Sequence, residues 1–251
     1  MSRIVVITGA SAGIGAELAA QLGRRGDRVV LAARREAALR EVAGRSGAEA
    51  LVVAADVTRR ADVDRLRDRA IERFGHVDVW VNNAGRGITR PVLELSDDEF
   101  DLMMSINAKS ALYGMQAIAP HFLERKRGQI INVSSMLGRV PVAAHRSAYN
   151  AAKHALNALT ANARTDLHAK CPDVHVTLVT PGVVSTDFHR NALGGSPPLP
   201  PNVPSQSAAE VAAAIVAAID HPVAELYTNR AQAGTVLKYF QDVAAFEREL
   251  S

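Results

Sequence analysis

Hydrophobic residues occur along this chain in short runs that are rich in valine and isoleucine. Most runs are continuous rather than alternating with polar residues, which is typical of strands buried on both faces of a parallel sheet. The expected strands are Ile4–Thr8, Arg28–Ala33, Ala50–Ala54, Val77–Val81, Gln129–Val133, His175–Thr180 and Glu225–Thr228.

Helical patterns separate these runs. Glycine ends the first pattern, one face of the third is charged, and capping boxes at Ser96–Glu99 and Ser207–Glu210 begin two others. The expected helices are Ala12–Gly23, Arg35–Ala43, Thr58–Phe74, a long zone from Ser96 to about Lys126, Ala148–Ala169 and the apolar stretch after Ser207. Strand and helix alternate without a break in composition. This predicts a single α/β domain over residues 1–251, a doubly wound parallel sheet of about seven strands with helices on both faces (Rossmann-type).

Composition and charge narrow the functional classes. Hydrophobic residues make up 48% of the 251 residues, but no stretch reaches the roughly 18 apolar residues of a membrane span. The chain enters its first strand at once, without a signal-peptide pattern, and its one cysteine, Cys171, excludes an intrachain disulfide. A net charge of +3 without a basic block does not favour nucleic acid as a partner, and the eight histidines lack metal-ligand spacing. We therefore expect a cytoplasmic protein without a metal.

A glycine-rich turn, Thr8-Gly-Ala-Ser-Ala-Gly-Ile-Gly15, follows the first expected strand and precedes a helix. Gly9 allows a tight turn, and Gly13 and Gly15 let a ligand or backbone approach closely. The free N–H groups at the start of the following helix suit a pyrophosphate. The turn therefore predicts a dinucleotide site.

A phenol and an ammonium lie four residues apart at Tyr149 and Lys153, on one face of an expected helix. Such spacing is common by chance. A nearby cation stabilises phenolate, however, and we expect it to lower the pKa of Tyr149 from its usual value of about 10. Tyr149 then gives or takes a proton at a carbonyl or alcohol oxygen.

Together these motifs resemble the short-chain dehydrogenase/reductase family in its compact form, over nearly the whole chain. The glycine turn resembles the family's cofactor loop, and Asn82-Asn-Ala-Gly85 matches its NNAG motif. The resemblance assigns a catalytic tetrad to Asn107, Ser135, Tyr149 and Lys153. It assigns cofactor contacts to Gly9, Ser11, Gly13, Ile14, Gly15, Asp56, Val57, Asn83, Ala84, Gly85, Tyr149, Lys153, Pro181, Gly182, Val184 and Thr186.

The end of the second expected strand indicates which nicotinamide cofactor binds. NAD sites usually have an acidic residue there, but this strand ends in alanine and is followed by Arg34 and Arg35. No carboxylate repels a 2′-phosphate at this position, and Arg34 can grip it as a planar fork. We expect Arg34, Arg35 and the Ser11 hydroxyl to favour NADP(H), unless the arginines only begin a solvated helix.

The resemblance implies hydride transfer between NADP(H) and a carbonyl or secondary alcohol, with Tyr149 as general acid or base. Lys153 would hold the nicotinamide ribose, and Asn107 would hold a water of the proton relay. Ser134 and Ser135 both end the fifth expected strand, and their side chains should point to opposite sides. The family pattern S-x-x-G selects Ser135 to hold the substrate oxygen.

Two other functions stay open: a regulatory protein that binds NADP without turnover, and an epimerase or dehydratase. We expect residues 188–206, rich in glycine and proline, and the segment 227–251 to cover a small-molecule substrate. His145 and His189 lie in segments expected to border that cleft. The family resemblance also implies a homodimer or homotetramer.

Overall fold

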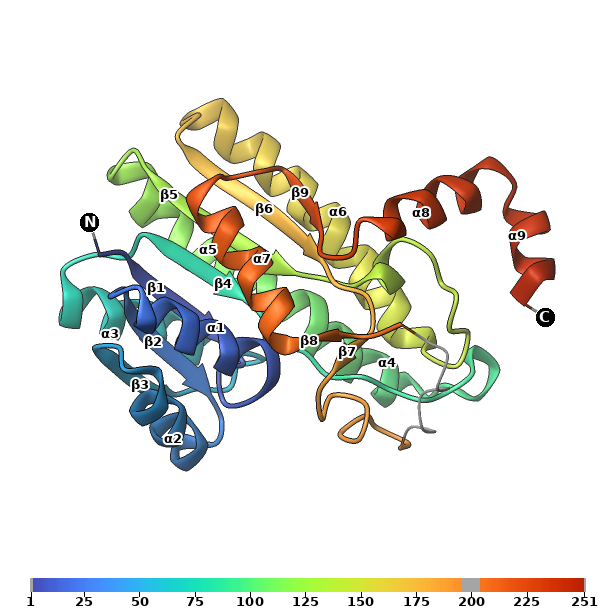
Figure 1. Ribbon diagram of the computed structural model, residues 1–251, viewed down its shortest axis with the longest axis horizontal. Helices are drawn as coiled ribbons and strands as arrows, with labels where there is room; N and C mark the ends of the chain where they lie inside the picture. Colours follow the sequence, from blue (N-terminus) through green and yellow to red (C-terminus); the bar gives the residue numbers. More distant parts are fainter. Residues whose placement is uncertain (1, 196–203, 251) are drawn as a thin grey trace.

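The computed structural model describes residues 2–195 and 204–250. Seven strands form one parallel sheet in the order β3-β2-β1-β4-β5-β6-β9, and helices cover both of its faces (Figure 1). The doubly wound α/β fold predicted from the hydrophobic runs is confirmed. The strands of this sheet are β1 (Ile4–Thr8), β2 (Arg28–Ala33), β3 (Ala50–Ala54), β4 (Val79–Asn82), β5 (Gly128–Val133), β6 (Val174–Thr180) and β9 (Glu225–Tyr227).

The order of the strands fixes where a ligand can bind. From β1 the chain moves outward to β2 and β3, and it then returns to β4 on the other side of β1. The connections after β1 and β4 therefore diverge, which opens a crevice at the carboxyl ends of these strands. The predicted glycine turn and the NNAG segment both lie at that crevice.

The helices agree closely with the predicted ranges, and both predicted capping boxes are formed. None of the helices within residues 2–195 and 204–250 is both long enough and apolar enough to cross a membrane. The helices are α1 (Gly13–Arg24), α2 (Glu36–Ser46), α3 (Arg60–Phe74), α4 (Asp97–Met104), α5 (Ser110–Glu124), α6 (Ser147–Lys170), α7 (Ala208–Asp220), α8 (Ala231–Gln241) and α9 (Val243–Leu250), with short 3-10 turns at Val92–Glu94 and Met136–Gly138.

Some features were not predicted from the sequence. A π-helical turn, Ser105–Lys109, interrupts the long helical zone, and β7 (Val184–Ser185) pairs with β8 (Gln206–Ser207). The segment expected as part of a substrate cover, 227–251, contains α8 and α9, which extend away from the sheet (Figure 1). Of the other expected cover, 188–206, residues 196–203 lie outside the described part of the chain.

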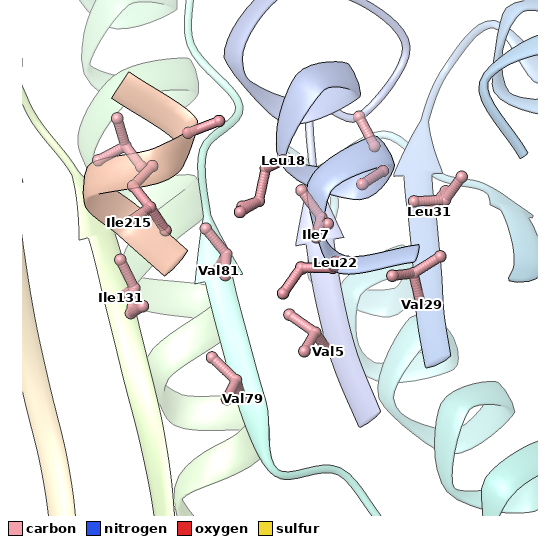
Figure 2. Close-up of a cluster of buried hydrophobic side chains, with 14 of the residues drawn as sticks. Val5, Ile7, Leu18, Leu22, Val29, Leu31, Val79, Val81, Ile131 and Ile215 are labelled. Carbon is pink, nitrogen blue, oxygen red and sulfur yellow. The ribbon is translucent and has the colours of Figure 1, made fainter. Parts of the chain in front are cut away.

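The face of the sheet that carries α1, α2 and α7 is sealed by aliphatic side chains (Figure 2). Leu18 and Leu22 of α1 pack with Ile7 of β1, while Ile215 of α7 belongs to the same cluster. All four side chains are fully buried, and each contributes about 1.5–3 kcal/mol by its burial. This packing fixes the position of α1, which begins directly after the glycine turn.

The opposite face packs against α3, α5 and α6 and contains polar groups as well as apolar ones. Trp80 of β4 is fully buried, and its Nε1 donates to Oδ1 of Asn82 at 2.8 Å. Asn82 in turn donates to Oδ1 of Asn132 at 2.8 Å, and Asn132 donates to Oγ1 of Thr160 at 2.9 Å. These bonds join β4, β5 and α6 just below the carboxyl edge of the sheet.

Replacing Gly114 with alanine is expected to destabilise the fold by about 1–3 kcal/mol, because the interior there has no room for a methyl group. A Cβ on Gly114 of α5 would lie 2.1 Å from Oδ1 of Asn82 and 2.6 Å from Nε1 of Trp80. Urea denaturation measures the loss. Gly44→Ala in α2 is the matched control, because a Cβ there meets nothing within 4 Å and should be neutral or stabilising. Equal stability of the two variants would contradict the predicted overpacking.

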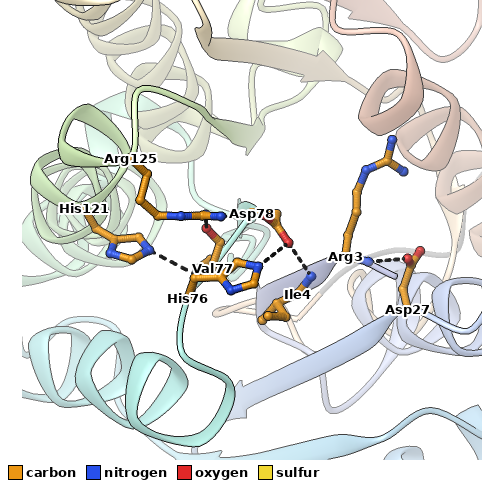
Figure 3. A network of polar contacts seen from close by, with 8 residues as sticks. All are labelled: Arg3, Ile4, Asp27, His76, Val77, Asp78, His121 and Arg125. Atoms are coloured by element: carbon orange, nitrogen blue, oxygen red, sulfur yellow. Dashed lines mark hydrogen bonds and ion pairs between the residues drawn. The ribbon is translucent and has the colours of Figure 1, made fainter. Parts of the chain in front are cut away.

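At the amino ends of the strands, polar groups tie neighbouring segments together (Figure 3). Asp78 accepts a hydrogen bond from the backbone N–H of Ile4 at 2.9 Å, and its Oδ1 lies 3.3 Å from Nη2 of Arg125. His121 of α5 accepts the backbone N–H of Val77 at its Nε2, at 3.2 Å. That bond requires a neutral imidazole, because a protonated ring has no acceptor.

Acidification below about pH 6.5 is expected to lower the free energy of unfolding. Burial, with a smaller contribution from Arg125, lowers the pKa of His121 from its usual 6.5. As the pH falls below 6.5, the unfolded chain takes up a proton at this ring before the folded protein does, so the equilibrium shifts towards the unfolded state. Above that pH both states are neutral and the effect vanishes.

Urea midpoints measured between about pH 8 and pH 5 test this expectation. His121→Gln keeps an acceptor but cannot titrate, so it should show a shallower loss of stability with acid than the wild type. The slope should not disappear, because burial also lowers the pKa of His145 and His189. An unchanged slope in the variant would show that His121 does not contribute.

Candidate active site at the carboxyl edge of the sheet

The glycine turn after β1 is held against the segment after β4. Gly9 has a φ of +66°, and a Cβ there would lie 2.8 Å from the Cα of Ala84. Thr8 Oγ1 accepts the backbone N–H groups of Asn83 and Ala84 at 3.0 and 3.2 Å, and Asn83 Nδ2 donates to the Thr8 carbonyl at 3.0 Å. Only glycine fits at position 9, where the two predicted motifs touch.

No side chain of α1 itself occupies the place where an anion could bind at the amino end of this helix. Its N-cap, Ala12, makes no side-chain capping bond, and the first turn of α1 contains no acidic residue. The N–H groups and the positive end of the helix dipole are therefore open to a phosphate. Gly13 has a φ of +55°, and a Cβ on it would lie 3.4 Å from Cγ2 of Thr186, so Thr186 faces this turn from the other side. Gly15 leaves no room for a side chain, since its Cβ would lie 2.6 Å from the Gly9 carbonyl.

The two arginines after β2 have different surroundings. Nη2 of Arg35 donates to Oγ of Ser11 at 3.3 Å, which places this guanidinium at the glycine turn. Arg34 is exposed at the end of the strand. Asp56, predicted to contact the cofactor, uses Oδ1 to accept the N–H and hydroxyl of Thr58 at 3.0 and 2.7 Å. Its carboxylate thus shapes the turn after β3.

Two predicted apolar contacts lie on opposite sides of the sheet. Ile14 and Val57 are partly buried, the first against the cluster under α1 and the second against the cluster under α3.

Pro181 and Gly182 follow β6, and the Pro181 carbonyl accepts the backbone N–H of Met136 at 2.7 Å. Val184 is buried in β7, so the predicted nicotinamide turn is held between β6 and β7.

Tyr149 is buried in the first turns of α6, beside Ser135 at the end of β5. The Ser135 side chain interacts with the phenol and favours the phenolate. Ser135 Oγ also accepts the backbone N–H of Leu137 at 3.1 Å. Ser134 instead donates to Oδ1 of Asn157 at 2.5 Å. The sequence left two serines open as the one that holds the substrate oxygen. In the structure Ser135 lies beside Tyr149, whereas the side chain of Ser134 points towards Asn157 of α6.

The expected direction of the Tyr149 pKa shift is wrong for this structure. Burial raises the pKa of Tyr149 to about 12, against smaller opposing effects of Ser135 and Arg146. Lys153 has its Nζ 5.7 Å from the centre of the Tyr149 ring and donates to the Val133 carbonyl at 2.9 Å. Burial also lowers the pKa of Lys153 to about 7. Loss of water around both groups therefore outweighs their mutual attraction.

Asn107 lies in the π-helical turn between α4 and α5 and is buried. Its Nδ2 donates to the carbonyls of Met103 and Arg86 at 3.1 and 2.9 Å, and its Oδ1 accepts the Arg86 N–H at 3.0 Å. Such turns are rare and occur often at functional sites. A Cβ on Gly85 would lie 3.0 Å from Oδ1 of Asn107 and 3.8 Å from Nζ of Lys153, so Asn107 and Lys153 flank the NNAG segment.

Sequence reasoning missed two side chains that the fold brings to this site. Arg146, which is 5% exposed, precedes Tyr149 by one helical turn. This spacing was visible in the sequence and could have identified Arg146. Gln232 of α8 fits against the turn after β6 with its amide oriented to accept the Gly182 N–H at 3.0 Å and donate to the Thr180 carbonyl at 3.3 Å. Nothing in the sequence pairs residues so far apart.

The residues present fit a nicotinamide dinucleotide. The uncapped start of α1 suits a pyrophosphate, the close contact at Gly9 holds the turn against Ala84, and Lys153 and Tyr149 lie beyond Gly85 along the same edge. Arg35 and Ser11 lie at the other end, after β2. One ligand that follows this edge would thus meet the arginines first and the tyrosine last.

Comparison with known proteins agrees with this geometry. The sequence model of the short chain dehydrogenase family matches residues 3–194. An uncharacterized oxidoreductase of Staphylococcus epidermidis is 35% identical over 184 residues, which cover 73% of this chain and 79% of the relative.

Solved structures agree over almost the whole chain. A short chain dehydrogenase/reductase from Burkholderia phymatum in complex with NAD has a TM-score of 0.88 and 27% identity, covering 97% of this chain and 95% of its own. A short chain dehydrogenase from Burkholderia cenocepacia in complex with NADP has a TM-score of 0.83 and 29% identity, covering 99% and 97%. With its fold, its glycine turn and the match over residues 3–194, this chain belongs to the short chain dehydrogenase family.

Proposed function

We propose that this protein is an NADP(H)-dependent oxidoreductase that interconverts a carbonyl compound and a secondary alcohol, with Tyr149 as the general acid or base. The observation that carries the proposal is the buried pair of hydroxyls, Ser135 and Tyr149, which interact at the carboxyl edge of the sheet. Two adjacent hydroxyls can hold one substrate oxygen, and one of them can pass it a proton. Hydride transfer itself is the chemistry of the bound nicotinamide.

Each member of the tetrad has a distinct part in this proposal. Ser135 positions the substrate oxygen, and Tyr149 donates a proton to it when the carbonyl is reduced. Lys153 binds the ribose hydroxyls of the cofactor, and its charge there favours the phenolate needed for the reverse reaction. Asn107 holds the NNAG segment through the backbone of Arg86, which keeps the lysine side of the site in place.

The preference for NADP(H) is supported by residues of this chain. The structural relatives include one bound to NAD and one bound to NADP, so the fold alone does not choose. Here β2 ends at Ala33, with no carboxylate to accept ribose hydroxyls, and Arg34 and Arg35 follow. Arg35 already contacts Ser11 at the glycine turn, where both could bind a 2′-phosphate.

A substrate panel tests the proposed function. The purified protein is given NADPH or NADH with sugars, steroids, acyl thioesters and aromatic ketones, and the absorbance of the reduced nicotinamide is followed. We expect oxidation of NADPH with at least one class of carbonyl and a lower rate with NADH. Tight NADPH binding without oxidation by any compound would favour the alternative of a cofactor-sensing protein.

A further inference from the structure

A short segment after β7 lies across the catalytic tyrosine. This strap, residues Phe188–Leu193, is joined to the segment after β4: the Leu193 N–H donates to the Gly87 carbonyl at 2.9 Å, and the Thr89 N–H donates to the Leu193 carbonyl at 2.8 Å. At its other end, the Phe188 ring meets the Tyr149 ring edge-on, with 5.6 Å between centroids. The strap therefore lies against the ring of Tyr149.

Arg146 connects the strap to the catalytic helix. Its Nη1 donates to the Ile88 carbonyl at 3.2 Å, and its Nη2 lies 3.2 Å from Nδ1 of His189. Because a guanidinium can only donate, His189 accepts this bond. A Cβ on Gly87 would lie 3.0 Å from Nη1 of Arg146 and 3.1 Å from Cε1 of Phe188, so the three segments meet at one point.

The guanidinium also acts on Tyr149 electrostatically. Arg146 lies one helical turn before Tyr149, is 5% exposed, and its charge lowers the pKa of the phenol. Burial lowers the pKa of Arg146, but a guanidinium remains charged at any physiological pH. Nearby titratable groups are Lys153, which faces the Tyr149 ring from the same helix, and His189 and His145, which lie close to Arg146. Of these, His189 must be neutral to accept from Arg146.

We propose that Arg146 is a positioning residue that holds the strap against Tyr149 and places a permanent positive charge beside its hydroxyl. The inference rests on the proposed function for the part that concerns turnover, while the mechanical part stands independently of it. Since two of its donors are used on Ile88 and His189, the guanidinium organises the cleft from within the protein.

Limited proteolysis tests the mechanical part without any substrate. The Arg190 side chain of the strap is 82% exposed, so trypsin can cut after it once the strap detaches. Loss of a charged hydrogen bond predicts that Arg146→Met raises the rate of this cut about tenfold or more. Cleavage after Lys238 of α8, measured in the same digest, should not change.

Two further variants make the proteolysis decisive. Arg164→Met is the matched control: like Arg146, the half-buried Arg164 donates to backbone carbonyls, those of Val176 and Ala224, but it lies far from the strap in sequence. Trypsin should cut the Arg164→Met variant after Arg190 at the wild-type rate. His189→Leu removes the acceptor from the strap side and should accelerate the cut even where Arg146→Met does not fold. An unchanged rate in both Arg146→Met and His189→Leu overturns the proposal.

Kinetics test the electrostatic part. In the oxidation of cyclohexanol with NADP⁺, the rate below the Tyr149 pKa follows the phenolate fraction, so removal of the Arg146 charge should lower kcat about tenfold at fixed pH and leave KM for NADP⁺ unchanged. The loss should be recovered as the pH is raised, and Arg146→Lys should restore the wild-type pH profile. A pH profile of Arg146→Met identical to that of the wild type overturns the proposal.

The two assays separate failure of this inference from failure of the proposed function. If the wild type oxidises no cyclohexanol and reduces no compound of the carbonyl panel, the proposed function fails, and the rate of the cut after Arg190 alone decides whether Arg146 holds the strap. If the wild type turns over, both the faster cut and the shifted pH profile are required.

Discussion

Replacing Tyr149 with phenylalanine is expected to lower kcat for carbonyl reduction by a factor of about 10²–10⁴, which is the usual contribution of a positioned general acid. The substitution keeps the ring, and with it the contact to Phe188, but it removes the hydroxyl that we propose passes a proton to the substrate oxygen. NADPH affinity should remain within about twofold, because the hydroxyl lies at the nicotinamide end of the proposed site and a single hydrogen bond contributes little net free energy.

Initial rates with the active compound from the panel measure kcat, and fluorescence titration measures the dissociation constant of NADPH. Tyr113→Phe is the matched control. Tyr113 lies on α5, and the Arg60 guanidinium lies 4.3 Å from the centre of the Tyr113 ring. Loss of the Tyr113 hydroxyl should leave the rate unchanged. A Tyr149→Phe rate near that of the wild type would falsify the assigned mechanism.

The second large effect concerns the cofactor. Replacing both Arg34 and Arg35 with alanine is expected to raise KM for NADPH by at least about 10- to 100-fold, because the loss of even one charged hydrogen bond to phosphate costs about 1.5–3 kcal/mol. KM for NADH should hardly change, because NADH carries no 2′-phosphate. The selectivity between the two cofactors should therefore disappear or reverse.

Single variants then resolve which arginine matters. Because Arg35 contacts Ser11 and Arg34 is exposed at the strand end, we expect both to contribute, with Ser11→Ala weakening the effect of Arg35. Arg40→Ala is the control, since Arg40 is an exposed arginine of α2 paired with Glu36. Equal losses for NADH and NADPH in the double variant would mean that the arginines support the fold of this edge instead of reading the phosphate.

The pKa values of Tyr149 and Lys153 show why a motif does not by itself define the state of its groups. The spacing predicts attraction between a phenolate and an ammonium on one helical face. Both groups are buried, however, so the structure raises the pKa of Tyr149 to about 12 and lowers that of Lys153 to about 7. Burial thus disfavours the charged form of each group, and further positive charge or hydrogen-bonding groups in the site would favour the phenolate again. In the proposed function, the cofactor's ribose and oxidised nicotinamide supply them.

Local signals determined much of this protein from the sequence alone. Continuous valine-rich runs located every strand of the main sheet, because strands covered on both faces need apolar residues at every position. Capping boxes located the starts of α4 and α7, since their side chains satisfy N–H groups only a few residues away. The glycine turn could be read because Gly9 occupies a backbone conformation that other residues avoid.

Tertiary structure decided what depends on partners distant in the chain. It turned Ser134 towards Asn157 and Ser135 towards Tyr149, and it brought Arg146 and the strap together beside the phenol. It also set the sign of the Tyr149 pKa shift, since desolvation comes from every segment that covers the ring, whereas spacing along one helix reports only the neighbours on that helix. The sequence by itself determined which chemical groups are available, and packing decided which of them meet and in what charge state.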